Sequence, residues 1–179
     1  MESGLKTRLD YGDYCAIPSN GNRYELIDGE VHVTPAPSPL HQDLIGNLFV
    51  ALRERLRPPM KVYVSPIDVI LGPHDVFQPD LVVIDNPAQV SDRGIEGPPL
   101  LVIEVLSPST TVYDRTTKSR RYATLGVPHL WLVDPATHRI ECYRREGSIY
   151  LPVVSASGAE MLAHPDFPTL SIPLSQLWP

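Results

Sequence analysis

The chain has 179 residues, of which 42% are hydrophobic and 20% charged, values ordinary for one globular domain. Its net charge of −6 argues against indiscriminate nucleic-acid binding through a basic surface, although it allows a local basic groove. No apolar run approaches the ~20 residues of a membrane span, and the N-terminus lacks the apolar centre of a signal peptide. Cys15 and Cys142 are too isolated to indicate a disulfide framework or a cysteine zinc site. We therefore expect a single domain over residues 1–179, no membrane partner and a cytoplasmic location.

The first third of the chain predicts a short helix, a β-hairpin and a longer helix. The short helix covers residues 9–16. Asp28-Gly29 is a two-residue turn signal between alternating segments, which predicts the hairpin. Ser38 offers an N-cap and Pro39 suits a first helical turn, and apolar residues then recur at helical spacing as far as Leu56.

The rest of the chain alternates between apolar strands and one helix. Residues 79–85 and 100–107 are nearly all apolar, as expected of strands covered on both faces. A helix over residues 111–125 ends before Gly126. Further strands are predicted at residues 61–72 (with a proline break), 129–135 and 139–145, and the proline-rich tail is expected to fold back onto the body. This order predicts an α/β fold with a mixed central sheet flanked by helices and an additional N-terminal hairpin.

Two acidic residues interrupt the apolar strands. Asp80 stands at the start of one strand and shares a face with Val82, and Glu104 lies within the next and shares a face with Val102. If these strands are neighbours, the two carboxylates could lie side by side, where they cannot both stay ionised without a compensating cation. Oxygen ligands without a His or Cys cluster favour Mg²⁺ or Mn²⁺ over zinc. The pattern therefore predicts a divalent-metal site.

The helix over residues 111–125 supplies a cation. Lys118 shares a face with Tyr122 and Leu125, so it lies on the packing side of the helix and could meet the two acids. The competing interpretation is an exposed helical ion pair with Asp114, one turn earlier, because such pairs are common.

His41 and Glu25 are weaker candidates from the residues alone. His41 precedes Leu44 and Ile45 at helical spacing and therefore points inward, where a hydrogen-bonded core histidine is the commoner role. Glu25 lies on the strand face opposite Leu26, and a surface or hairpin ion pair is its commoner role.

Two segments hold eight of the 15 Lys and Arg residues, residues 53–61 and 114–122. They are either solvated helix faces or contacts for a nucleic-acid backbone. Other chemistries find no support, because the sequence has no nucleophile elbow, no phosphate-binding glycine loop and no HExxH motif.

Five segments of the chain together resemble the Uma-two family of restriction-endonuclease-like proteins, within the PD-(D/E)xK nuclease superfamily: RYELIDGEVHVTPAPSPLHQ, QPDLVVID, GPPLLVIEVLSPST, DRTTKSRRYATLGVPHLWLVDP and SIPLSQLWP. The similarity runs from about residue 9 to residue 179. It implies a restriction-endonuclease-like core and an Mg²⁺-dependent phosphodiesterase site.

The resemblance also implies roles for particular residues. Asp80 matches the PD aspartate and Glu104 the second acid. The superfamily pattern places a lysine two residues after that acid, where this chain has Leu106, and in this family the lysine is thought to come from the following helix, which matches Lys118. Glu25 and His41 fall in segments characteristic of the family, which favours placing them in the same pocket.

These observations lead to a metal-dependent endonuclease as the expected function, with Asp80, Glu104, Lys118, Glu25 and His41 at the catalytic site. The expected partner is nucleic acid, preferably DNA, and a homodimer would suit a double-strand cutter. Two alternatives stay open. One is a nuclease-fold protein that binds nucleic acid or a partner without cutting. The other is a structural interaction module in which the two acids are paired to arginines.

Overall fold

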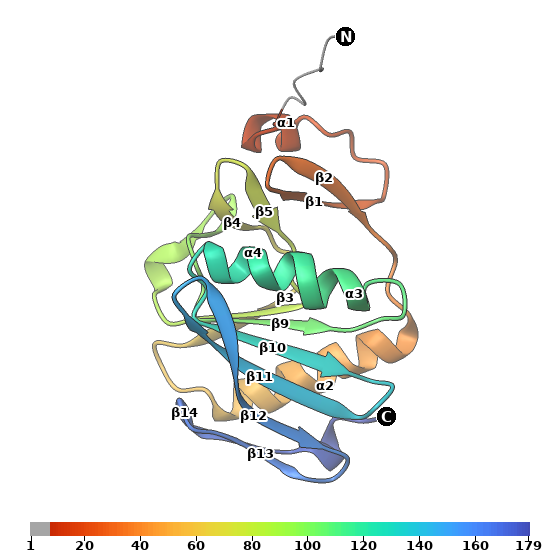
Figure 1. The fold of residues 1–179 in the computed structure, drawn as a ribbon, viewed down its shortest axis with the longest axis vertical. Helices are drawn as coiled ribbons and strands as arrows, with labels where there is room; N and C mark the ends of the chain where they lie inside the picture. Colours follow the sequence, from red (N-terminus) through yellow and green to blue (C-terminus); the bar gives the residue numbers. More distant parts are fainter. Residues whose placement is uncertain (1–7) are drawn as a thin grey trace.

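The computed structural model describes residues 8–179, which form two six-stranded sheets, a two-stranded sheet and a small number of helices (Figure 1). The helical segments are α1 (Tyr11–Cys15), α2 (Pro39–Arg55), η1 (Pro87–Gln89), α3 (Thr111–Tyr113), η2 (Asp114–Lys118), α4 (Ser119–Thr124) and η3 (Leu174–Gln176). Within the described residues, no helix is long and apolar enough to cross a membrane.

The sheet that we call the N-terminal sheet contains the predicted hairpin and four further strands in the order β2-β1-β5-β4-β8-β7. Its strands are β1 (Arg23–Ile27), β2 (Glu30–Thr34), β4 (Val69–Gly72), β5 (Asp75–Phe77), β7 (Val90–Ser91) and β8 (Gly94–Glu96). The predicted hairpin is confirmed: β1 and β2 pair antiparallel, and Asp28 and Gly29 both have positive φ, at 53° and 78°. A two-residue hairpin turn of this kind requires that backbone conformation.

The sheet that we call the central sheet has the order β12-β11-β10-β9-β6-β3. Its strands are β3 (Lys61–Val64), β6 (Leu81–Ile84), β9 (Leu101–Val105), β10 (His129–Asp134), β11 (Arg139–Glu146) and β12 (Ile149–Ser157). β9 runs parallel to β10 and antiparallel to β6, so the sheet is mixed, as predicted. A separate hairpin of β13 (Met161–His164) and β14 (Phe167–Pro173) lies below it in Figure 1.

The two faces of the central sheet have different covers. Leu81 and Ile103 belong to one apolar cluster with α2 and the β13–β14 hairpin. Val102 and Leu132 face the other way, where Tyr122 of α4 packs on them. Figure 1 shows α3 and α4 crossing between the two large sheets. Because both faces are covered, β6 and β9 are buried at every position, which explains their almost unbroken apolar sequence.

The prediction of one strand with a proline break over residues 61–72 was wrong. Residues before Pro66 form β3 in the central sheet, whereas those after Ile67 form β4 in the N-terminal sheet. Proline cannot donate a hydrogen bond to a strand ladder, so it stands where the chain leaves one sheet for the other.

The predicted helix over residues 111–125 is present but is not a regular α-helix. Its middle, η2, is a π-helical turn in which the backbone N–H of Ser119 donates to Asp114 O, five residues earlier. Single π-helical turns occur often at functional sites. The tail does fold back onto the body, because Leu174 and Leu177 are fully buried against the α2 face of the core.

Candidate active site

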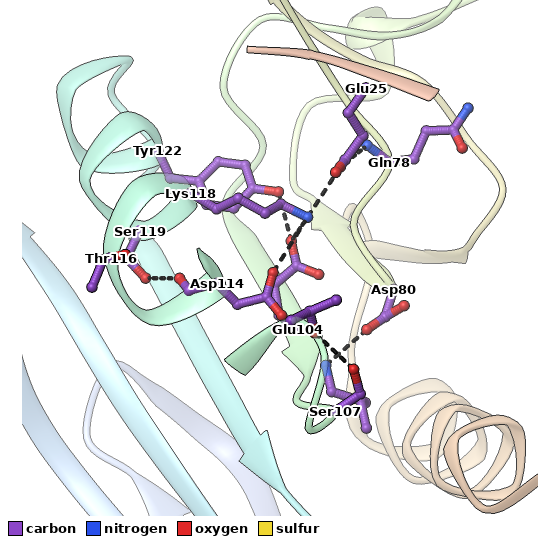
Figure 2. Close-up of polar contacts among 12 residues, drawn as sticks. Glu25, Gln78, Asp80, Glu104, Ser107, Asp114, Thr116, Lys118, Ser119 and Tyr122 are labelled. Carbon is purple, nitrogen blue, oxygen red and sulfur yellow. Dashed lines mark hydrogen bonds and ion pairs between the residues drawn. The ribbon is translucent and has the colours of Figure 1, made fainter. Parts of the chain in front are cut away.

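Asp80 and Glu104 lie on the same face of the central sheet. β6 and β9 pair with Leu81 opposite Ile103, so the same register, continued by one residue, brings Asp80 opposite Glu104. Both side chains are buried, with relative exposures of 7% and 4%. The backbone N–H of Val105 donates a 2.8 Å hydrogen bond to Asp80 Oδ2, which fixes that carboxylate against β9 (Figure 2).

Lys118 reaches this pair of acids from the helical segment. Its Nζ lies 2.8 Å from Glu104 Oε1 and 3.0 Å from Glu25 Oε1, and Figure 2 shows it between these two carboxylates. Asp114 Oδ1 is farther away, at 3.9 Å. The alternative of an exposed helical pair between Lys118 and Asp114 was therefore wrong, since both side chains are buried and the shorter contacts go to the sheets.

The π-helical turn places several polar side chains of the segment over the same spot. Asp114, Lys118 and Tyr122 are four residues apart in sequence, and all three are buried on the side that faces the sheets. The Tyr122 hydroxyl donates a 2.7 Å hydrogen bond to Glu104 Oε1. The Tyr122 hydroxyl and the Lys118 ammonium therefore both contact Glu104 Oε1. The other carboxylate oxygen, Oε2, takes part in neither of these two contacts.

Glu25 comes from the N-terminal sheet, not from the central one. It is 3% exposed, and the backbone N–H of Gln78 donates a 2.8 Å hydrogen bond to its Oε1. The interpretation of Glu25 as a surface residue was wrong. The chain runs from β5 in one sheet through Gln78 to Asp80 at the start of β6 in the other, so this short connection holds Glu25 and Asp80 near each other.

His41 lies in the first turn of α2 and contacts Asp80. Its Nε2 is 3.2 Å from Asp80 Oδ2 and 3.0 Å from Val105 O. Burial lowers the pKa of the imidazole, but the hydrogen bond and the charge of Asp80 outweigh burial, so the pKa lies above its ordinary value. His41 points inward, as predicted, and its side chain is 13% exposed.

The five predicted site residues line one cavity of about 460 Å³ that is open to solvent: Glu25, His41, Asp80, Glu104 and Lys118. Its rim is formed by two loops, residues 34–38 between β2 and α2 and residues 107–110 between β9 and α3. Arg23 of β1 also lines the cavity, and its guanidinium donates to Gln78 O at 3.0 Å. The cavity is thus the place where the two sheets, α2 and the helical segment meet.

Acidic groups outnumber cations among the buried residues of this cavity. The acids are Glu25, Asp80, Glu104 and Asp114, and the buried cation among them is Lys118. Burial raises the pKa of the Glu104 carboxyl to about 8, because Lys118 offsets only part of the desolvation penalty and the other acids add repulsion. Burial also raises the pKa of Asp114.

Lys118 remains charged in this environment. Burial lowers the pKa of its ammonium, but attraction from Glu104, Glu25 and Asp114 outweighs the desolvation and raises the pKa well above its ordinary value. The cavity therefore carries a permanent positive group and an excess of carboxyl groups.

The donor set fits a hard divalent cation. Asp80 Oδ1 and Glu104 Oε2 are not used in the hydrogen bonds described above, and both residues line the cavity. Carboxylate oxygens are the ligands that Mg²⁺ and Mn²⁺ prefer, and the excess of acids over cations leaves negative charge for such an ion to neutralise. The residues present are thus compatible with the predicted metal.

The structure argues against the arginine-paired interaction module. Among the described residues, neither Asp80 nor Glu104 makes an ion pair or hydrogen bond with an arginine. A bidentate arginine contact of that kind does occur next to the site, between Arg121 and Asp75, at 2.8 and 2.6 Å.

Leu106, which stands where the superfamily pattern has a lysine, is 3% exposed and packs in an apolar cluster with Phe77 and Tyr122. A lysine there would place its charge among apolar side chains. The ammonium at the acids comes from Lys118, two elements later in the chain, as the resemblance implied.

The two basic segments do not form a common basic surface. Residues 53–61 include the end of α2 that is remote from His41, and Lys61 pairs with Ile84, at the end of β6 away from Asp80. In the second segment, Arg115 pairs with Glu141 at 2.6 Å and Arg121 with Asp75. Much of the positive charge is therefore neutralised within the protein.

Asp114 and Tyr122 also lie at the site, although the sequence pattern predicted no role for them there. Their four-residue spacing on either side of Lys118 was the available signal, because it puts all three on one side of a helix. The contact of the Tyr122 hydroxyl with Glu104 could not be read from that spacing, since it depends on the tertiary packing of the helix on β9.

The mixed central sheet, the covering helices and the carboxylates of Asp80 before β6 and Glu104 in β9 define a restriction-endonuclease-like fold. A crystal structure from Anabaena variabilis, described as a "putative nuclease", has this fold: it superposes with a TM-score of 0.76 and 17% sequence identity over 94% of this chain and 97% of that one. The Uma2 family, described as "Putative restriction endonuclease", matches residues 10–175, and the chain belongs to this family. No match was found among curated proteins.

Proposed function

We propose that the protein is a divalent-metal-dependent endonuclease that hydrolyses phosphodiester bonds of nucleic acid, with DNA as the favoured substrate. The observation that carries the proposal is the convergence of Asp80, Glu104 and Lys118 on one solvent-reachable cavity. Membership of the Uma2 family and the similarity in fold to the Anabaena protein support the same activity.

Asp80 and Glu104 would hold Mg²⁺ or Mn²⁺, because both line the cavity and each has a carboxylate oxygen outside the contacts described above. When bound, the ion would supply Lewis-acid stabilisation of the charge that develops on the phosphate. The Val105 N–H holds Asp80 in place, and Tyr122 does the same for Glu104.

Lys118 would act on the reacting groups through its charge. Its ammonium carries three N–H donors, and Glu25 and Glu104 fix its position without closing the cavity. It could therefore donate to a phosphate oxygen or orient the attacking water, as preorganised donors do in other enzymes. His41 would keep Asp80 oriented toward the cavity, and its raised pKa favours the protonated imidazole.

The activity can be tested with supercoiled plasmid and single-stranded DNA in Mg²⁺ or Mn²⁺ and in chelator. We expect metal-dependent cleavage that falls by about 100-fold or more in Asp80→Asn and in Lys118→Met, because each removes an interaction made with the reacting groups. Asp85→Asn is the matched control, since Asp85 is an exposed acid at the other end of the same strand. Cleavage that survives Asp80→Asn would overturn the proposal.

A second candidate function is binding without cleavage. The observation that favours it is the short contact of Lys118 with both Glu25 and Glu104, which holds the ammonium in ion pairs. In that case fluorescence anisotropy would detect DNA binding, whereas calorimetry would detect no Mg²⁺ binding and the plasmid would stay intact.

For the endonuclease, two active sites would be needed to cut both strands, so we propose that it acts as a homodimer.

A further inference from the structure

A second group of metal-ligating side chains lies on the opposite face of the central sheet from Glu104. His129 begins β10, His164 ends β13, and Asp166 lies in the turn that joins β13 to β14. One potential ligand atom from each residue lies within 4.8 Å of those of the other two. His129 shares its face with Trp131, which belongs to the α2 side of the core, whereas Glu104 faces α4.

The two imidazoles are buried but incompletely paired. His129 is 7% exposed and His164 3%. Among the described residues, His129 Nδ1 and His164 Nε2 have no hydrogen-bond partner. An unpaired buried polar group costs about 1–3 kcal/mol, so two of them in one cluster call for an explanation. His129 Nδ1 faces Asp166 Oδ2 at 3.9 Å, which is too long for a hydrogen bond.

We propose that His129, His164 and Asp166 form a zinc-binding site that stabilises the fold. Two imidazoles and one carboxylate are a known zinc ligand set, with a fourth position left for water. Neutral imidazole is the form that binds a metal, and burial lowers the pKa of both histidines, that of His164 to about 4. The side chain of Asp166 is 29% exposed, so an ion can reach the cluster from solvent.

Two existing contacts oppose the metal. The backbone N–H of Asp166 donates a 3.1 Å hydrogen bond to His164 Nδ1, and coordination through either ring nitrogen would cost this bond. Arg144 Nη1 lies 3.2 Å from each carboxylate oxygen of Asp166 and would have to share it. The Arg144 contact is exposed, where an ion pair contributes little, whereas the hydrogen bond to His164 is partly buried and its loss is a cost that zinc binding must exceed.

Zinc bound at this site would stabilise the C-terminal β13–β14 hairpin. β13 and β14 pair only with each other in the described part of the chain, so side-chain contacts, and no strand-to-strand ladder, join the hairpin to the central sheet. A zinc ion held by β10 and by the β13–β14 hairpin would cross-link the hairpin to the sheet. A ligand that binds only the folded state raises its stability in proportion to the logarithm of its concentration.

The test uses the full-length protein without a histidine tag, in an Asp80→Asn, Glu104→Gln background that removes the acidic cavity as a competing site. We expect the metal-stripped protein to take up one Zn²⁺ per chain, with a higher Tm, and to give the visible absorption of tetrahedral Co²⁺ when Co²⁺ replaces zinc. Asp166→Ala should weaken Zn²⁺ binding by more than about tenfold, and His164→Ala should abolish it.

The matched controls are Asp92→Ala and His138→Ala, which remove an exposed residue of each type. They should leave Zn²⁺ affinity unchanged. If His164→Ala fails to fold, Asp166→Ala still decides, because Asp166 is partly exposed and its loss leaves the core intact. Uptake of less than one zinc per chain, or uptake that Asp166→Ala does not weaken, would overturn the proposal and leave the cluster as aromatic packing of His129 and His164 on Phe167.

Discussion

Lys118 and Glu104 are in direct contact, with 2.8 Å between Nζ and Oε1, although one comes from a helical segment and the other from a central strand. The contact places a permanent positive charge inside a group of buried acids. Removing either partner therefore changes both the charge of the cavity and the stability of the fold.

Replacing the lysine should separate metal binding from cleavage. In Lys118→Met the buried acids lose their cation, so we expect the metal-free protein to be destabilised by about 3–5 kcal/mol, as when one partner of a buried pair is removed. Mg²⁺ should bind more tightly, since ammonium repulsion is gone, while cleavage is lost. Urea unfolding and calorimetry measure these effects, and Lys61→Met, at an exposed lysine, is the control. Weaker Mg²⁺ binding in Lys118→Met would contradict the prediction.

The raised pKa of Glu104 predicts a pH-dependent stability. The pKa is about 8 in the folded protein and about 4.5 when unfolded, so the folded state holds a proton that the unfolded state has released across this interval. The contribution to stability is complete below pH 4.5 and is lost as pH rises toward 8. In Glu104→Gln the free energy of unfolding of the metal-free protein should depend less on pH over this range. Equal slopes in both proteins would exclude the shifted pKa.

The same proton should compete with the metal. Glu104 must lose it to become a ligand, so Mg²⁺ affinity should rise with pH up to about 8, by as much as about tenfold per pH unit, and then level off. Calorimetry in buffers of different ionisation enthalpy would also detect the released proton. An affinity that is constant from pH 6 to 9 would show that Glu104 is already ionised in the metal-free protein.

The Tyr122 hydroxyl should tune the metal site. Its 2.7 Å hydrogen bond orients Glu104, so Tyr122→Phe should weaken Mg²⁺ binding by about 10–100-fold, the usual effect of removing a group that orients a ligand. Tyr150→Phe removes another largely buried hydroxyl, which donates to Val127 O at 2.9 Å, and should leave Mg²⁺ affinity unchanged. Equal effects of the two variants would assign the loss to general destabilisation.

The π-helical turn should be necessary for activity. Deleting the exposed Thr117 removes one residue from η2 and converts the turn toward an α-helix, which leaves Asp114 and Lys118 three residues apart and so displaces one relative to the other. We expect about 100-fold slower cleavage, the cost of a displacement of about 1 Å in a catalytic group. Thr117→Ala keeps the residue count and should cleave normally. Full activity in the deletion variant would show that the turn has no role.

The positions of Asp80, Glu104 and Lys118 could be predicted from the sequence because they depend on the periodicity of single strands and of one helix. Alternation along β6 and β9 places Asp80 and Glu104 on one face, and helical spacing turns Lys118 inward. Glu25 was not placed by such rules, because its contact with Lys118 depends on the docking of two sheets that residues 23–34 do not specify. The catalytic roles, and the single domain over residues 1–179, stay predictions.

Several strands were also predicted wrongly or not at all, because strand pairing is not determined by local sequence. The strand predicted over residues 61–72 was divided between two sheets, since periodicity reports strand conformation but not strand partner. β12 and the β13–β14 hairpin were not predicted as strands, because Pro152, Pro168 and Pro173 interrupt segments that nonetheless pair. Proline at these positions is compatible with edge strands.

Glu25 and Glu104 stand on different sheets, and Lys118 contacts both. Catalysis would therefore be the most fragile property of the molecule: a small separation of the two sheets breaks the ammonium bridge while the interior around the buried Trp131 stays closed. We expect cleavage to disappear at a lower urea concentration than the fluorescence change of the tryptophans, and backbone amides of β1 to exchange with solvent before those of β9.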